Sequence, residues 1–260
     1  MTKRTWFVVG LTIASIVAAF LLPAVPQPMA YHDFADKRAY YGVANFLDVT
    51  SNAGFLIAGL AGLVVALSPK TVFESPSERW PYAIFFVGLM LTAVGSGYYH
   101  LAPDNERLFW DRLPMTIAFM SLIAAQIVDR MGRRAGLILL GPALLVGAAS
   151  VFYWIATERA GAGNLVPYAI LQAYSVFMVL LIAVLHPSRY TRGSDIYWVF
   201  GAYVLAKVFE TFDKQILDIG NIVSGHSLKH VAAAVAGLIV MRMLILRTVD
   251  RQPAASAAAA

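Results

Sequence analysis

The sequence predicts an all-α protein, a polytopic bundle of transmembrane helices with a seven-helix core and one extra N-terminal helix. Two observations carry this prediction. Hydrophobic residues make up 59% of the 260 positions, and charged residues make up only 13%. Apolar runs also recur along the whole chain, and a run of about 20 residues is long enough to cross a bilayer as a helix.

The net charge of +5 and the absence of cysteine narrow the range of functions. Lysine and arginine stand mainly in the short connections between apolar runs, where the positive-inside rule explains them without a nucleic-acid partner. A chain without cysteine has no disulfide, no thiolate metal site and no cysteine nucleophile. Any bound metal must therefore be held by nitrogen and oxygen atoms.

The first apolar run, residues 6–25, follows Lys3 and Arg4 and has two readings. It is long for the core of a signal peptide, and the residues before Ala30 form a poor cleavage site. We therefore expect residues 1–30 to form a retained membrane anchor and a linker. A cleaved signal peptide is the alternative.

Seven further runs predict one helical domain over residues 31–249. In chain order they cover residues 43–67, 81–100, 113–128, 135–155, 166–186, 197–212 and 226–246. In the first of these, Gly54, Ala58 and Gly62 form a ridge of small residues that suits close helix packing. The alanine-rich residues 250–260 have nothing to pack against and are expected to be a disordered tail.

The basic residues also predict the orientation in the membrane. The loop with Arg130, Arg133 and Arg134 is the strongest indication of a cytoplasmic side. Both termini are then cytoplasmic. The helix ends that carry the histidine pair of the last run face the opposite, extracytoplasmic side.

Five polar residues stand at these outer helix ends: Ser96, His100, Asp111, His226 and His230. Ser96 and His100 are four residues apart and share one face of a helix, as do His226 and His230. Polar side chains of this kind are costly inside a bilayer. The shared depth of His100, Asp111, His226 and His230 predicts that three imidazoles and a carboxylate converge at one site.

Three neutral imidazoles with an open fourth position are typical of catalytic zinc. With zinc on His100, His226 and His230, Asp111 would accept a proton from an activated water. Ser96, one turn deeper than His100, would donate a hydrogen bond to a developing oxyanion. Two alternatives stay open from the residues alone: haem ligation, and a proton relay in a transporter.

A second polar segment opens the run at residues 43–67. Asn45, Asp48 and Asn52 follow one helical stripe, which predicts a ladder of hydrogen bonds between helices. The alternative is a second shell or a cation site near the outer surface, which would also include Asp33, Asp36 and Ser51.

Four charged residues lie near the outer ends of the last two runs. They are Lys207, Glu210, Asp213 and Lys229. Lone charges are expensive in a membrane, so we expect these four to pair with one another around the same polar cavity.

Three separated motifs resemble the alkaline ceramidase family, within the superfamily that includes the adiponectin-receptor-like proteins. They are NFLDVTSN at residues 45–52, GSGYYH at 95–100 with the aspartate of WDRLPM eleven residues later, and GHSLKH at 225–230. The resemblance covers roughly residues 33–246, and the motifs agree with the family in order and spacing.

The resemblance implies a seven-helix ceramidase-like catalytic domain with zinc on His100, His226 and His230. It implies Ser96 and Asp111 as the catalytic pair. The expected reaction is hydrolysis of the amide of a ceramide-like lipid, which gives a free fatty acid and a sphingoid base or related amine. A zinc-containing, lipid-sensing receptor on the same scaffold is the alternative function.

The resemblance also bears on calcium. Family members bind this ion through acidic residues, whose approximate counterparts here are Asp33, Asp36 and Asn45. Asn45 is neutral where the family has a glutamate, and hard cations prefer charged oxygen ligands.

Overall fold

A computed structural model describes residues 2–250, and this part of the chain is a bundle of helices without a β strand. The helices are α1 (Lys3–Leu21), α2 (Phe46–Thr50), α3 (Ala53–Leu67), α4 (Arg79–Leu101), α5 (Asn105–Arg130), α6 (Arg133–Arg159), α7 (Val166–Leu185), α8 (Asp195–Thr211), α9 (Asp213–Gly220) and α10 (Gly225–Leu246). Two short 3-10 helices, η1 (Met29–His32) and η2 (Pro76–Glu78), lie in the connections. The predicted all-α fold is confirmed.

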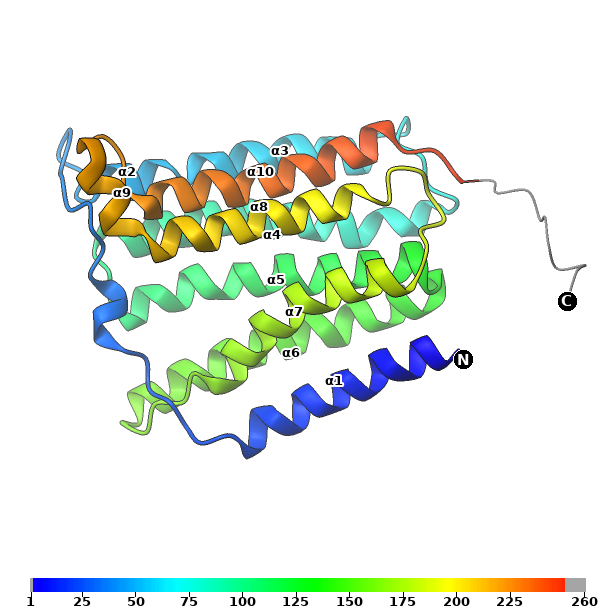
Figure 1. Ribbon diagram of the computed structural model, residues 1–260, viewed down its shortest axis with the longest axis horizontal. Helices are drawn as coiled ribbons and strands as arrows, with labels where there is room; N and C mark the ends of the chain where they lie inside the picture. Colours follow the sequence, from blue (N-terminus) through cyan, green and yellow to red (C-terminus); the bar gives the residue numbers. More distant parts are fainter. Residues whose placement is uncertain (1, 251–260) are drawn as a thin grey trace, which may run out of the picture.

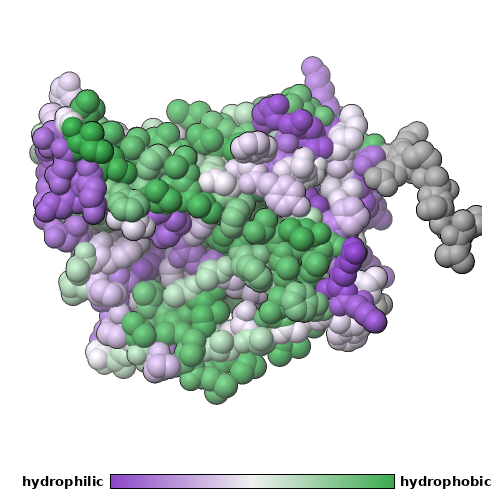
Figure 2. All heavy atoms as spheres, viewed as in Figure 1, coloured by the Kyte–Doolittle hydropathy of each residue, from purple (hydrophilic) through white to green (hydrophobic). Residues whose placement is uncertain are grey.

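Seven segments of the described chain are long and apolar enough to cross a membrane: α1, α2 with α3, η2 with α4, α5, α6, α7 and α10. The shorter α8 runs beside α10 along the bundle (Figure 1). Figure 2 shows apolar residues over much of the visible face and hydrophilic residues gathered mainly toward its two ends. This distribution matches a multi-pass membrane protein.

The extra N-terminal helix lies at the edge of the bundle, against α7 (Figure 1). Only Val8 of α1 is buried. Two polar contacts hold α1 in place: Thr12 Oγ1 and Tyr174 Oη lie 2.9 Å apart, and Arg4 donates to the Leu185 carbonyl oxygen at 3.0 Å. The core therefore consists of the segments from α2 to α10, as the sequence predicts.

The ridge of small residues in α3 brings three helices together. A Cβ atom added to Gly54 would lie 3.0 Å from the Ala234 side chain of α10. One added to Gly62 would lie 2.0 Å from the Phe86 ring of α4. Because Ala58 between them is fully buried, the ridge allows α3 to approach both neighbours closely.

Two predicted boundaries are wrong. The run at 43–67 is two helices, because the Ser51 and Asn52 side chains donate to the Asp48 carbonyl and tighten the chain into a turn. Helix α5 begins at Asn105 rather than near residue 113, since Asp104 caps it by accepting from Arg107 N at 2.7 Å. The predicted disordered tail lies, apart from residue 250, outside the described residues.

Candidate active site

Three histidines converge where the C-terminal end of α4 meets the start of α10. His100 stands in the last turn of α4, and His226 and His230 stand on the first two turns of α10. Ser224 caps α10 by accepting from Ser227 N at 3.0 Å. All three imidazoles are buried, and one ring nitrogen from each lies within 4.8 Å of the others. We name these three residues the histidine cluster.

Neighbouring side chains orient the histidine cluster. Ser51 Oγ lies 2.8 Å from His230 Nδ1, which leaves Nε2 of that ring free to face the other histidines. Asn45 donates to the His100 carbonyl oxygen at 2.8 Å. The Nε2 atoms of His100 and His226 are 3.2 Å apart. Second-shell contacts of this kind fix which ring nitrogen is available to a metal.

Asp48 ties α2 to the start of α10 behind the histidine cluster. It is fully buried, and its Oδ1 atom accepts from Ser224 Oγ at 3.1 Å and from Ser227 Oγ at 2.6 Å. Asn52 is also buried, but its side chain donates to the Asp48 carbonyl of the preceding helix, α2. The polar segment thus forms hydrogen bonds between α2 and α10, and Ser51 contacts His230.

The sequence analysis includes Asp33 and Asp36 in a possible cation site. In the structure both carboxylates pair with basic side chains of the same loop. Asp33 is exposed and pairs with Lys37. Asp36 is buried and pairs with Arg38 at 2.7 Å, and this guanidinium also donates to the Asn221 and Ile222 carbonyls. The hydrogen bonds from Arg38 hold the pKa of the Asp36 carboxyl below its ordinary range.

Ser96 and Asp111 lie on the wall of a cavity of about 320 Å³ that also includes His230. Both are buried, and their side chains are neighbours across the α4–α5 interface. Gly95 makes this approach possible, because a Cβ atom there would lie 1.9 Å from the Trp110 carbonyl oxygen of α5. The structure therefore brings all five predicted site residues to one place.

The rest of the cavity is mostly apolar. Its lining includes Phe55, Phe85, Leu89, Phe119, Leu122 and Val179. At its α7–α8 side it shares Val176, Phe200, Tyr203 and Lys207 with a more open groove between these two helices. A hydrocarbon chain fits such a lining, and the groove lies directly beside it.

Comparison with known proteins agrees with this geometry. The family model described as Ceramidase matches residues 38–258, which is most of the chain. The chain belongs to the ceramidase family. Membership makes it a membrane enzyme of ceramide hydrolysis, with a lipid substrate. No curated protein sequence matches the chain.

In this ceramidase-family chain, three of the four charged residues that the sequence predicts to pair with one another do so beside the histidine cluster. Glu210 bonds to Lys229 at 2.7 Å and also to Lys207, and all three line the cavity. The prediction is wrong for Asp213. That residue opens α9 after the chain turns at Phe212, so its carboxylate accepts from the backbone N–H groups of Ala35 and His226 instead.

Arg112 is a cavity residue that the sequence reasoning missed. Its side chain is 4% exposed and lines the cavity one residue after Asp111. The available signal was an arginine inside a segment that crosses the membrane, where a buried charge marks function by default. The resemblance drew attention to Asp111 and left its neighbour without a role.

Proposed function

We propose that this chain is a zinc-dependent amidohydrolase that cleaves ceramide-like N-acylated lipids into a fatty acid and a sphingoid or related amine. The observation that carries the proposal is that His230, one of the three clustered histidines, lines the same cavity as Ser96 and Asp111. Family membership supports the hydrolase, and the buried nitrogen donors support the metal.

The donor set fits zinc. Three ring nitrogens within 4.8 Å of one another, with no thiolate in the chain, match the three-histidine arrangement of catalytic zinc. Two of these nitrogens, the Nε2 atoms of His100 and His226, face each other at 3.2 Å. When bound, zinc supplies a Lewis acid that makes water nucleophilic at neutral pH.

The chain's own residues have separate roles in the proposed reaction. Asp111 accepts the proton of the attacking water and returns it to the amine that leaves. Ser96, beside Asp111, donates a hydrogen bond to the amide oxygen as negative charge develops there. Ser51 keeps His230 in one orientation through its 2.8 Å contact with Nδ1. The apolar lining holds the acyl chain away from water.

We further propose the arrangement that the sequence predicts around this site. Residues 31–249 form the catalytic domain and residues 1–30 form an anchor and linker. Both termini are cytoplasmic, and the site faces the extracytoplasmic side. A calcium ion at Asp33, Asp36 and Asn45, which the resemblance implies, stays a prediction; in the structure Asp33 pairs with Lys37 and Asp36 pairs with Arg38.

Metal analysis and an activity assay on protein purified in mild detergent test the proposal. We expect about one zinc per chain, release of fatty acid from N-acylsphingosine, and loss of this activity on chelation with recovery on adding zinc. A Soret band with stoichiometric iron would contradict the zinc assignment. Zinc without release of fatty acid from any N-acyl lipid would favour the lipid-sensing receptor.

A further inference from the structure

Arg112 is enclosed on one wall of the cavity in a cage of aromatic rings. Its guanidinium lies 4.3 Å from the centre of the Trp154 ring, 4.8 Å from Tyr168 and 5.4 Å from Tyr31. One terminal nitrogen, Nη2, donates to Gln27 Oε1 at 2.6 Å. The other, Nη1, is buried and has no hydrogen-bond partner.

No carboxylate in residues 2–250 lies within ion-pair distance of Arg112. Glu158 contacts two residues of this cage but does not pair with Arg112. Its carboxylate accepts from Gln27 N at 2.7 Å and from Trp154 Nε1 at 3.1 Å. Leaving a buried charge without a partner is costly, and aromatic rings compensate only part of that cost.

A second caged arginine in the same chain shows what a complete environment contains. Arg247 is as deeply buried and has three rings around its guanidinium, from Phe73, Tyr82 and Tyr190. It also has a carboxylate, because Asp129 lies 3.0 Å away. Arg112 has the rings without the acid, and a cavity lies where a partner could enter.

The charges around the cavity also favour an anion. Its charged lining residues are Asp111, Arg112, Lys207, Glu210 and Lys229. Glu210 is shared by both lysines, and Asp111 is the base of the proposed reaction. The three cationic residues of the lining therefore outnumber the two acidic ones.

We propose that Arg112 binds an acidic group on the head of the substrate, which makes the preferred substrate an N-acylated amine that bears a carboxylate, phosphate or sulfonate, with neutral ceramides as slower substrates. This inference rests on the proposed amide hydrolysis. Arg112 directly follows Asp111 and lines the same cavity, so an acid close to the scissile amide reaches the guanidinium while the acyl chain occupies the apolar lining. The planar guanidinium fork suits all three anions.

Turnover of two probes with one acyl chain tests the preference. We expect the wild type to cleave N-lauroylglycine at least about 10-fold more efficiently than the neutral N-lauroylethanolamine, the size of one charge-assisted hydrogen bond. Arg112→Gln should remove this preference, and Arg112→Lys, which keeps the charge, should retain part of it. Arg107→Gln is the matched control, since Arg107 lies over the Tyr98 ring on the same helix but outside the cavity.

Equal use of both probes by the wild type would overturn the proposal. An equal loss on both probes in Arg112→Gln, with no preference in Arg112→Lys, would also overturn it, because that pattern belongs to a structural arginine.

A binding experiment separates this inference from the proposed reaction. In the Asp111→Asn background no turnover is needed, and calorimetry can compare N-lauroylglycine, N-lauroylethanolamine and laurate. We expect Arg112→Gln to weaken binding of N-lauroylglycine by about 10- to 100-fold. If hydrolysis fails but this loss is observed, acid recognition stands and the enzyme assignment falls. If laurate binds as tightly as N-lauroylglycine, and Arg112→Gln weakens its binding by as much, Arg112 holds the released fatty acid and the head-group assignment is wrong.

Discussion

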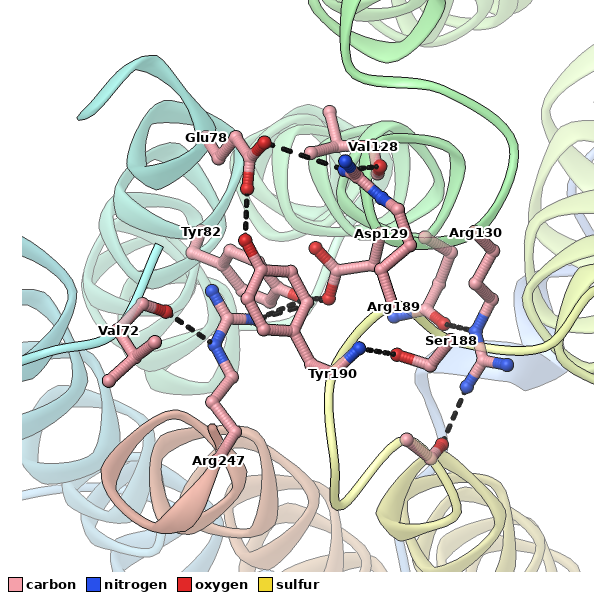
Figure 3. A network of polar contacts seen from close by, with 12 residues as sticks. Val72, Glu78, Tyr82, Val128, Asp129, Arg130, Ser188, Arg189, Tyr190 and Arg247 are labelled. Carbon is pink, nitrogen blue, oxygen red and sulfur yellow. Dashed lines mark hydrogen bonds and ion pairs between the residues drawn. The ribbon is translucent and has the colours of Figure 1, made fainter. Parts of the chain in front are cut away.

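The two ends of the bundle both bury polar side chains, but they pair them differently. At the end opposite the histidine cluster, Arg247 from the end of α10 meets Asp129 of α5 at 3.0 Å (Figure 3). Tyr82 of α4 donates to the same carboxylate at 2.5 Å, and Tyr190 donates to the fully buried Glu78. We name these five residues the Arg247 network.

In the Arg247 network acids face bases and tyrosines, and the contacts join four separate parts of the chain. At the histidine cluster, the Nε2 atoms of His100 and His226 face each other across 3.2 Å, and the third histidine, His230, lines a cavity. Burial of polar groups therefore does not by itself identify a site in a membrane protein. Groups of like chemistry that converge beside a cavity do, because they need a ligand to complete them.

The largest effect is expected at the histidine cluster. His226→Ala or His230→Ala removes one of three nitrogen ligands, and the remaining two leave an inadequate zinc site. Zinc content and lipid amide hydrolysis should both fall to background, as measured by elemental analysis and fatty-acid release, while helix content stays at the wild-type level. A variant that loses zinc but keeps turnover would show that the cluster is structural, like the Arg247 network.

The next largest effect separates chemistry from metal binding. Asp111→Asn should keep zinc and lower the turnover rate by roughly 10²- to 10⁴-fold, because an amide cannot accept the proton. Ser96→Ala should lower it by roughly 10²- to 10³-fold through loss of one oxyanion donor. Steady-state rates and zinc content are measured together. Near-full activity of zinc-loaded Asp111→Asn would rule out Asp111 as the base.

A change in the Arg247 network should affect stability rather than chemistry. Asp129→Asn leaves Arg247 as a buried charge without its acid, which typically costs about 3–5 kcal/mol. Thermal unfolding in detergent should shift downward, while zinc content and turnover of the folded fraction stay unchanged. Glu106→Gln is the control, because its ion pair with Arg159 is exposed and is expected to contribute about 1 kcal/mol or less. Equal shifts for both variants would contradict the contrast between buried and exposed pairs.

The smallest effect concerns the loop beside the histidine cluster. The pKa of Asp36 is lowered in the folded protein by Arg38, so this contact stabilises the fold at neutral pH. The stabilisation is lost as the pH falls through the lowered pKa. Asp36→Asn should cost about 1 kcal/mol at neutral pH, since Arg38 is partly exposed. The melting temperatures of the wild type and of Asp36→Asn are compared as the pH is lowered. If both fall equally, the contact between Asp36 and Arg38 does not cause the loss of stability in acid.

Hydropathy predicted the bundle well because a bilayer requires long apolar helices. It failed at the start of α5, where five polar residues among 105–112 lower the hydropathy of a helical turn that Asp104 caps. It also failed at Ser51 and Asn52, because side-chain bonds to the Asp48 carbonyl are invisible in an apolar periodicity. Hydropathy patterns predict where helices lie, whereas the positions at which helices begin or are interrupted depend on individual side-chain hydrogen bonds.

The candidate site could be predicted for residues that share a helix face. Spacing alone places Ser96 beside His100 and His226 beside His230. It cannot place Asp213, whose direction depends on the turn between α8 and α9. Nor can spacing show that Arg112 lacks an acid, because that depends on what three other segments bring to its cage.

The histidine cluster also has a consequence for the timing of biosynthesis. His100 belongs to α4, but His226 and His230 belong to α10, the last helix of the described chain. A nascent chain that has reached α8 already has most of its membrane segments and Asp111, yet it carries only one of the three histidines. The site is completed only when α10 joins α3, α4 and α8. Under the proposed function, a chain that is still being inserted therefore cannot hydrolyse lipids of the surrounding membrane before α10 has been made.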